Sequence, residues 1–158
     1  MKHNKKVALK LTIDKQAHLT GHNASIYALA PFSTSNTFLS AAGDGWIVKW
    51  DLDDPEMGRL LAKVETQVFS LAYLHEYELV IAGNMNGGVH WINTQNLSDA
   101  KNVAHHSKGV FGIQQVGKYI FTIGGGGLLT KWSIDGMRTL ESLHLSNRSL
   151  RSICYVPE

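Results

Sequence analysis

The chain has 158 residues, of which 44% are hydrophobic and 18% charged, and its formal net charge is +2. These values are typical of a soluble globular protein and exclude a disordered tail. So small a charge, with the basic residues scattered, provides no basic stripe for nucleic acid, and no stretch approaches the roughly 20 apolar residues that span a bilayer. We therefore expect no nucleic-acid partner and no membrane partner.

The sequence contains one cysteine, Cys154. A single cysteine cannot form an internal disulfide, so nothing in the sequence indicates an oxidising compartment. We expect a cytoplasmic protein.

Short segments with alternating or β-branched and aromatic residues predict strands along the whole chain. In chain order, they are an N-terminal outer strand within residues 1–20, then residues 37–42, 46–50, 59–63, 118–123, 128–132 and 138–145. Glycine-containing turns at Asp44-Gly45 and Asn86-Gly87 join strands into hairpins. Residues 53–58 and 93–99 predict loops, and no segment has the pattern of a long amphipathic helix.

A pattern also recurs along the chain. Similar four-residue segments begin at Ile26, Val68, Val110 and Leu150, in steps of 42, 42 and 40 residues. The turn glycines keep nearly the same spacing. Recurrence at this period indicates tandem copies of one supersecondary unit. Each unit is predicted to contain four antiparallel strands, with units at residues 21–64, 65–104 and 105–146 and the first strand of a fourth at residues 147–158.

The first unit resembles a WD40 repeat. It contains Gly21-His22, then Ser40 late in a strand, the turn Asp44-Gly45, and Trp50-Asp51. The resemblance implies an all-β, WD40-type β-propeller whose blades lie radially around a channel, with the first strand of each blade innermost. The second copy departs from the pattern at Val64, Ala82, Asn86 and Ile92, and the third at Gly126 and Ser133. In the first and third copies, Lys49 and Lys131 precede the tryptophan, where the family usually has an aliphatic residue.

His22, Ser40 and Asp44 could be mistaken for a catalytic triad. The resemblance instead implies that they form, with Trp50, a buried hydrogen-bond network that holds a blade together. The third unit keeps His106, Thr122 and Trp132 but has Gly126 in place of the aspartate. Because its network is incomplete, we expect the third blade to be less stable.

Other features give no indication of a cofactor. Residues 124–127 are four glycines, but no Lys-Ser/Thr pair or helix follows, as a phosphate-binding loop requires. The eight histidines lack the spacing of a preformed metal site. We therefore predict no catalytic residue, no metal and no cofactor.

The resemblance implies that one rim of the propeller binds protein partners. By their position in the repeat, the rim residues are Ser25, Tyr27, Gln67, Phe69, Met85, Phe111 and Arg151. Tyrosine, phenylalanine and arginine are residue types that anchor interfaces, although these aromatic side chains could also simply pack beside the channel. The sequence thus favours a non-enzymatic protein-interaction scaffold. The alternative is a propeller-based hydrolase or lactonase with a metal in the channel, for which stoichiometric calcium or zinc in the purified protein would be decisive.

Three units and part of a fourth do not close a ring, since propellers have roughly 4–8 blades. We expect the remaining blades to be supplied by another part of a longer propeller. The alternative is a second copy of the chain that completes the ring in a symmetric pair.

Overall fold

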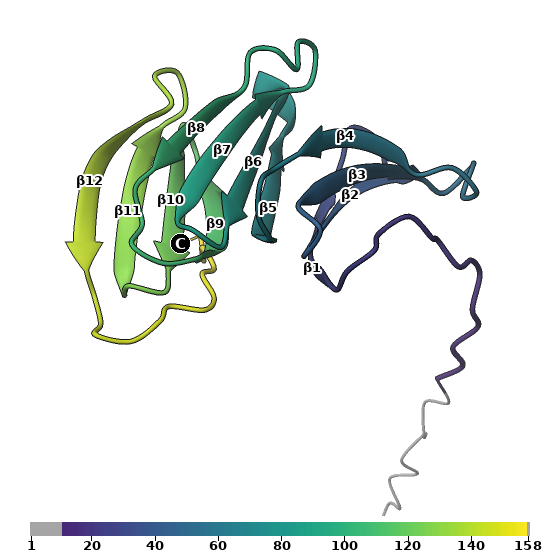
Figure 1. The fold of residues 1–158 in the computed structure, drawn as a ribbon, viewed down its shortest axis with the longest axis horizontal. Helices are drawn as coiled ribbons and strands as arrows, with labels where there is room; N and C mark the ends of the chain where they lie inside the picture. The colour runs from purple at the N-terminus through teal and green to yellow at the C-terminus, as the bar shows by residue number, and fades with distance from the viewer. Residues whose placement is uncertain (1–10, 158) are drawn as a thin grey trace, which may run out of the picture.

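The computed structural model describes residues 11–157, and within this range the strands form three antiparallel sheets of four strands each. Strands that are consecutive in sequence are neighbours in each sheet. Figure 1 shows the sheets following one another in chain order, from purple to yellow, in an open fan. The prediction of an all-β protein made of four-stranded blades is confirmed, and the ring is not closed.

The first blade consists of β1 (Ile26–Pro31), β2 (Thr37–Ala42), β3 (Trp46–Asp51) and β4 (Arg59–Lys63). The second consists of β5 (Val68–Leu74), β6 (Leu79–Asn84), β7 (Gly88–Asn93) and β8 (Lys101–Ala104), with a 3-10 turn, η1 (His75–Tyr77), between β5 and β6. The third consists of β9 (Val110–Val116), β10 (Tyr119–Gly124), β11 (Leu128–Ser133) and β12 (Arg138–His144). The first strands of these three blades begin at the residues that the repeat predicts.

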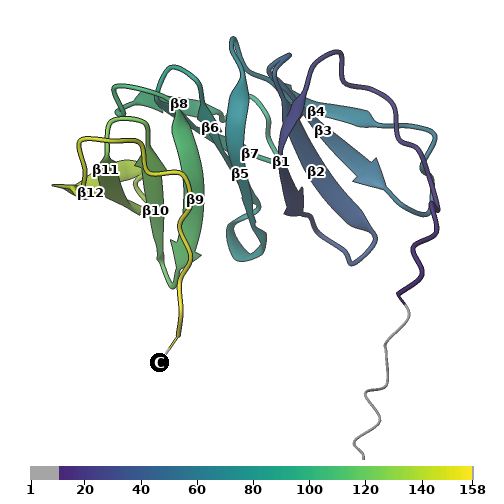
Figure 2. The ribbon, with the colours of Figure 1, turned by 90° about the horizontal axis from the view of Figure 1, so that it is seen from below.

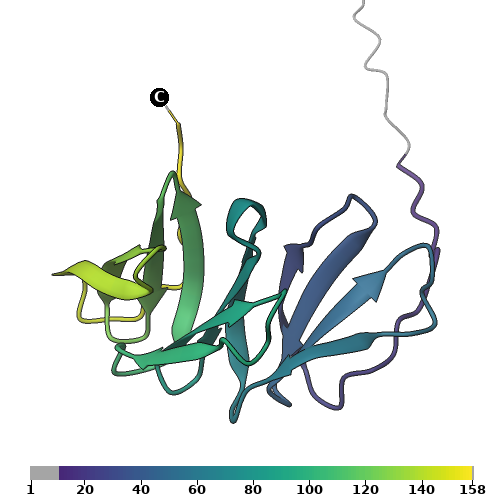
Figure 3. The same cartoon turned by 90° about the horizontal axis from the view of Figure 1, so that it is seen from above.

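The first strand of each blade lies innermost. β1 packs beside β5, and β5 packs beside β9. Figures 2 and 3 show these strands side by side, with the outer strands of each sheet turned away from them. This arrangement brings residues about 42 positions apart in sequence next to one another in space, as a radial stack of blades requires.

Turn glycines allow the second and third strands of each blade to form a hairpin. Gly45, Gly87 and Gly127 have φ angles of 77°, 86° and 75°. A Cβ atom at any of them would collide with a backbone carbonyl oxygen: that of Val64, His106 or Ser146, respectively. Only glycine fits both the left-handed backbone and the close approach of the chain that enters the next blade.

Two apolar layers hold the blades together. The layer between the first and second blades is built from Leu39, Ala41, Ile47, Val64, Val68, Val80, Ala82 and Ile92. The layer between the second and third contains Leu74, Leu79, Ile81, Val89, Trp91, Val110, Ile120, Trp132 and Ile134. The ring centroids of Trp91 and Trp132 are 5.9 Å apart. Trp91 thus packs between blades, as its position suggests. Because each layer needs side chains from two blades, neither blade face can be buried by one blade alone.

Two lysines that precede a tryptophan lie over aromatic rings. The Lys49 ammonium is 4.9 Å from the centroid of Phe32, and that of Lys131 is 4.0 Å from the centroid of Tyr119. At these distances a cation is attracted to the face of the ring. This contact explains how the chain accommodates a charged residue where the family usually has an aliphatic one.

Two expected strands are not observed. The N-terminal outer strand was expected within residues 1–20, of which 1–10 lie outside the described residues, and residues 11–20 contain no strand. Leu11 and Ile13 are 83% and 85% exposed. Residues 147–157, expected to include the first strand of a fourth blade, also contain none. A strand forms by pairing with another strand of its own blade, and no described strand belongs to the blades that these two segments would complete.

The C-terminal segment nevertheless follows the inner face of the third blade. Its yellow ribbon runs along β9 in Figure 2. The backbone N–H of Leu150 donates to the carbonyl oxygen of Gly124 at 3.1 Å. A Cβ added to Gly112 would lie 3.0 Å from Cγ2 of Ile153. The segment therefore lies where the repeat positions an inner strand, although it is not paired as one.

Candidate functional site

The polar residues of the first blade form one connected network. The Trp50 indole N–H donates to Ser40 Oγ at 2.7 Å, and Ser40 Oγ lies 2.6 Å from His22 Nε2. His22 Nδ1 lies 3.1 Å from Oδ2 of Asp44. The Asp44 carboxylate also accepts the backbone N–H groups of Asn23 and Trp46, each at 2.9 Å. The network thus joins the loop before β1 to β2, β3 and the turn between them.

The geometry of this network suits a structural role better than nucleophilic catalysis. Ser40 is 1% exposed, and its hydroxyl oxygen is bonded on both sides, by Trp50 and by His22. Burial alone would raise the pKa of Asp44. However, the N–H groups of Trp46 and Asn23 and the His22 side chain outweigh burial and lower that pKa. Asp44 is therefore an ionised acceptor at neutral pH, and the buried hydroxyl is not accessible to a substrate.

The second blade has a different polar pair in the same region. The Asn84 side-chain amide N–H donates to His90 Nε2 at 2.9 Å. Oδ1 of Asn84 accepts the backbone N–H groups of Asn86 and Gly88 at 3.0 and 2.8 Å. Burial lowers the pKa of His90, in keeping with a neutral ring that accepts at Nε2. The Asn84–His90 pair could not be predicted from the sequence, because neither residue occupies a position of the WD40 hydrogen-bond network.

In the third blade the network ends at the histidine. The Trp132 indole N–H donates to Thr122 Oγ1 at 2.8 Å, and the same oxygen lies 2.8 Å from His106 Nε2. His106 Nδ1 is buried and has no partner within the described part of the chain. Gly126 has no side chain to offer it. Burial, with a smaller effect of neighbouring His105, lowers the pKa of His106 to about 4.

The buried His106 should make stability depend on pH. Its pKa is about 4 when folded, against 6.5 for an ordinary histidine, so the unfolded chain binds a proton more readily. The contribution of His106 to the free energy of unfolding should therefore be constant above pH about 6.5, decrease as the pH falls from 6.5 to 4, and be constant again below. Chemical denaturation at several pH values measures this slope. His106→Gln should reduce the slope, and the remainder between pH 6.5 and 4 should come mainly from His90 and His105, whose pKa values are also lowered by burial.

The predicted rim residues include a continuous row of side chains across the three blades. Tyr27 and Phe69 meet edge to face with ring centroids 4.9 Å apart, and Phe69 lies 5.4 Å from Phe111. The Arg151 guanidinium carbon is 4.1 Å from the centroid of Phe111. We call these four residues the rim row. They also line one groove of about 300 Å³ on the inner face of the blades.

A β-bulge positions each aromatic residue of the rim row. The pairing of β1 with β2 skips Tyr27, that of β5 with β6 skips Phe69, and that of β9 with β10 skips Phe111. A bulge leaves one residue out of the ladder and changes the direction of its side chain. The recurrence of this bulge in three blades explains why aromatic residues that are 42 positions apart form one row. No signal in the sequence predicted the bulges.

The other predicted rim residues lie beside the row. The carbonyl oxygens of Ser25 and Gln67 accept the N–H groups of Gly43 and Met85 at 2.9 and 2.8 Å, which ties each inner strand to the turn of its own blade. Ser25 is exposed and Met85 is 47% exposed, whereas Gln67 is half-buried. The rim therefore combines an aromatic row with the polar residues Ser25 and Gln67 and the long apolar side chain of Met85.

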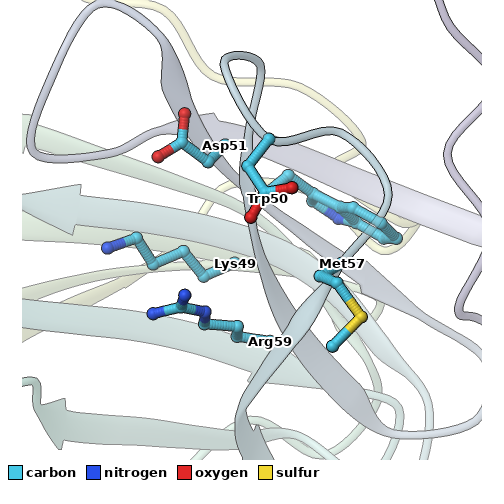
Figure 4. Close-up of a pocket in the computed structure, with 6 residues that line it drawn as sticks. Lys49, Trp50, Asp51, Met57 and Arg59 are labelled. Carbon is cyan, nitrogen blue, oxygen red and sulfur yellow. The ribbon is translucent and has the colours of Figure 1, made fainter.

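The pocket on the β3–β4 side of Trp50 is too small to hold a typical substrate, whereas the groove on the side of His22 and Ser40 has a volume of about 510 Å³. The small pocket is shown in Figure 4, has a volume of about 60 Å³ and lies at the outer part of the first blade, lined by Lys49, Asp51, Met57 and Arg59. Ligand pockets usually measure about 300–1,000 Å³.

In residues 11–157, no group of three or more His, Cys, Asp or Glu side chains is arranged to hold a metal ion. The same residues include no helix with the length and hydropathy of a membrane span.

Comparison with known proteins agrees with the observed fold. Residues 13–51 match the model of the family described as WD domain, G-beta repeat. This match identifies residues 13–51 as a WD40 repeat, and the three four-stranded sheets give the chain the fold of an unclosed WD40-type β-propeller. The chain contains a WD40 repeat. No curated protein sequence matches it.

Solved structures, one of them titled as WD40 repeats, superpose on this chain. The structure titled "Structure of U3-55K" is 18% identical with a TM-score of 0.73 and aligns with 83% of this chain and 42% of its own. "Crystal structure of RRP9 WD40 repeats" is 17% identical with a TM-score of 0.73 and the same coverage. "Crystal structure of the computationally designed Ika4 protein" is 20% identical, TM-score 0.70, and aligns over 89% of this chain and 85% of its own. At such identities the similarity concerns the fold alone.

The WD40-repeat chain spans 42% of the length of the first two of these structures. WD40-repeat proteins generally act as non-catalytic scaffolds for protein interactions. This general role is the starting point for assigning a function to the rim row.

Proposed function

We propose that this WD40-repeat protein is a non-enzymatic scaffold that binds protein partners through the rim row. One observation carries the proposal: Tyr27, Phe69, Phe111 and Arg151 form one continuous row across the blades, and Tyr27 remains 51% exposed. Aromatic and arginine side chains dominate the energetics of protein interfaces. A row of them on strands that are held rigid by packed sheets presents such anchors at little cost in conformational entropy.

The chemistry of the surrounding residues favours binding over catalysis. The groove beside the rim row is lined by the row itself, by apolar residues such as Leu29 and Leu71, and by Ser70 and Ser152. The Ser70 hydroxyl donates to the carbonyl oxygen of Val110 at 2.9 Å, and none of the lining residues is a His, Asp or Glu that could activate a hydroxyl. The Ser40 hydroxyl is buried within the first blade's network. A groove lined by aromatic rings, serines and an arginine is suited to a peptide segment that has both apolar and polar side chains.

Removal of the aromatic rings tests this function. In Phe69→Ala/Phe111→Ala, partner proteins captured by the tagged protein should be lost, because the central anchors are gone. Leu140→Ala is the matched control, since Leu140 is an exposed apolar residue on the outer strand β12, away from the row. Quantitative mass spectrometry compares the proteins captured by the wild-type chain, by the double variant and by the control variant. Tyr27→Ala, at an exposed position, repeats the test with little risk to folding. Unchanged capture by folded rim variants would refute the assignment.

We also propose that further blades cover the outward face of the first blade. Ile26 and Leu29 are 54% and 65% exposed there, and they line a groove of about 510 Å³ together with Phe38. Exposed apolar side chains that line one groove are a common feature of interaction sites. The remaining blades of a longer propeller are our preferred occupant, and a second copy of the chain is the alternative. Solution mass measured at several concentrations distinguishes the longer propeller from the pair of copies.

We also propose a cytoplasmic location for this scaffold, which the single cysteine supports.

A further inference from the structure

The turn of the third blade has the same backbone as that of the first but lacks its carboxylate. The N–H of Gly45 donates to Ala42 O at 3.2 Å, and the N–H of Gly127 donates to Gly124 O at 3.2 Å. The φ angles of the two donors are 77° and 75°. Gly126 therefore occupies the position that Asp44 has in the first blade.

The donors that surround Asp44 have counterparts around Gly126. Asp44 accepts from His22 Nδ1 and from the backbone N–H groups of Asn23 and Trp46. Two repeats later in sequence, His106, Ser107 and Leu128 occupy the corresponding positions. Gly126 and Ser107 are accessible to solvent. A Cβ on Gly126 would have only Ser107 Oγ within 4 Å. We call the four residues His106, Ser107, Gly126 and Leu128 the Gly126 notch.

The His106 ring has an unpartnered nitrogen beside the turn that contains Gly126. His106 is 5% exposed, and its Nδ1 has no partner within the described residues. In the first blade, His22 Nδ1 faces the Asp44 carboxylate and therefore carries the ring proton. We assign the same tautomer to His106, with the Thr122 hydroxyl accepting the Trp132 N–H and donating to His106 Nε2. Nδ1 lies 3.0 Å from where a Cβ on Gly124 would be, at the base of the turn. A buried N–H in this position requires an acceptor.

The mouth of the Gly126 notch is positively charged. The three segments that form the third blade's rim, residues 105–109, 124–128 and 146–151, contain Lys108, Arg148 and Arg151 and no acidic residue. The Lys108 Cβ lies 2.8 Å from where a Cβ on Gly125 would be. The equivalent segments of the first blade, residues 21–25, 42–46 and 64–67, contain Asp44 and Glu65 and no lysine or arginine. The rim thus changes from acidic at the first blade to basic at the third.

We propose that the Gly126 notch binds an aspartate or glutamate side chain of a peptide partner. The carboxylate of that side chain accepts the His106 Nδ1–H, in the place that corresponds to the Asp44 carboxylate of the first blade. This inference rests on the proposed rim function and specifies its partner chemistry. Arg151 connects the two surfaces, because it stacks on Phe111 at the end of the rim row and belongs to the basic mouth. The partner peptide therefore has an acidic residue at one end and apolar side chains along the row.

An internal carboxylate tests whether the notch accepts this group. Gly126→Asp should raise the melting temperature by about 2–4 °C relative to Gly126→Ala, as expected for one added charge-assisted hydrogen bond in a chain of this length. The alanine variant is the matched control, because both substitutions add a Cβ beside Ser107 Oγ, which must rotate away. If Gly126→Asp is no more stable than Gly126→Ala, the notch does not accept a carboxylate and the proposal is overturned.

Acetate tests the same point with a free carboxylate. Nuclear magnetic resonance of the His106 ring nitrogens should show a saturable shift at Nδ1 during titration with acetate, and no shift with acetamide, which has the same shape but no charge. In Gly126→Asp the acetate response should be lost, since the notch is filled. An equal response to acetate and acetamide, or no response to acetate, would show that a water molecule or nothing at all serves as the acceptor.

Peptide selection separates this proposal from the rim function. Random heptapeptides selected on the wild-type chain should be enriched in Asp or Glu at one position. Replacement of that residue by Asn or Gln should weaken binding by about tenfold or more, as should Gly126→Asp in the protein. Peptides that depend on Phe69 and Phe111 but show neither effect would retain the rim function and overturn the acidic contact. If no peptide is selected while acetate still shifts His106, the rim function fails and the carboxylate site stands.

Discussion

Gly87→Ala should be among the most destabilising single substitutions in this chain. Gly87 has a φ angle of 86°, and an added Cβ would collide with the carbonyl oxygen of His106. A left-handed backbone costs a non-glycine residue about 1–2 kcal/mol, and overpacking against a fixed atom costs about 1–3 kcal/mol more. We therefore expect a loss of about 2–5 kcal/mol in the free energy of unfolding. Urea denaturation measures it.

Gly117 provides a matched control for this prediction. It also has a positive φ angle, 55°, but an added Cβ would meet nothing within 4 Å. Gly117→Ala should thus cost only the conformational part, about 1 kcal/mol. The difference between the two variants measures the close approach of the chain at the turn. Equal losses would mean that the backbone near His106 moves away freely and that turn packing does not constrain the blades.

Trp132→Ala should have an effect of similar size for a different reason. Trp132 is fully buried between the second and third blades and packs against Trp91. Truncation of a buried tryptophan leaves a cavity and costs about 3–5 kcal/mol. Because both blades contribute side chains to this layer, removal of the Trp132 ring should weaken the packing of the third blade on the second. Hydrogen exchange of β9 to β12, together with the free energy of unfolding, measures both effects.

Two conservative variants separate packing from hydrogen bonding in this layer. Trp132→Phe keeps one aromatic ring at this position but removes the indole N–H that donates to Thr122 Oγ1. Trp91→Phe removes an indole N–H that has no partner in residues 11–157. Loss of a hydrogen bond costs about 1 kcal/mol, whereas loss of an unpaired buried donor costs nothing in hydrogen bonding. Trp132→Phe should therefore be the more destabilising of the two. The reverse order would contradict the role assigned to the Thr122 network.

Local patterns were enough to predict the repeated unit. Alternating apolar residues and turn glycines depend on neighbours close in sequence, and they predicted β2, β3 and β4 and the first residues of β1, β5 and β9. The 42-residue recurrence then indicated tandem copies of one unit. The resemblance of the first copy to a WD40 repeat implied radial blades, and it also implied that Tyr27, Phe69 and Phe111 lie at one rim. Their order along the chain, one per inner strand, determines that they are neighbours.

Contacts between distant residues explain what the local patterns missed. The N-terminal strand was expected from local alternation and the C-terminal strand from the recurrence at Leu150. However, a strand needs a partner edge, and residues 11–20 and 147–157 would complete blades to which no described strand belongs. The β-bulges that aim the rim row arise from pairing with β2, β6 and β10. The Asn84–His90 pair and the unpaired Nδ1 of His106 became visible only when burial was known.

The repeat unit, its period and the residue type at each position can therefore be read from the amino-acid order, since they depend on residues close together along the chain. The bulges in strand pairing, the absence of strands at the two ends of the described chain and the burial of polar atoms such as His106 Nδ1 cannot be read in this way, and they required the folded molecule. The physical reason is that segments far apart in sequence must come together before a strand edge is paired or a polar atom loses water.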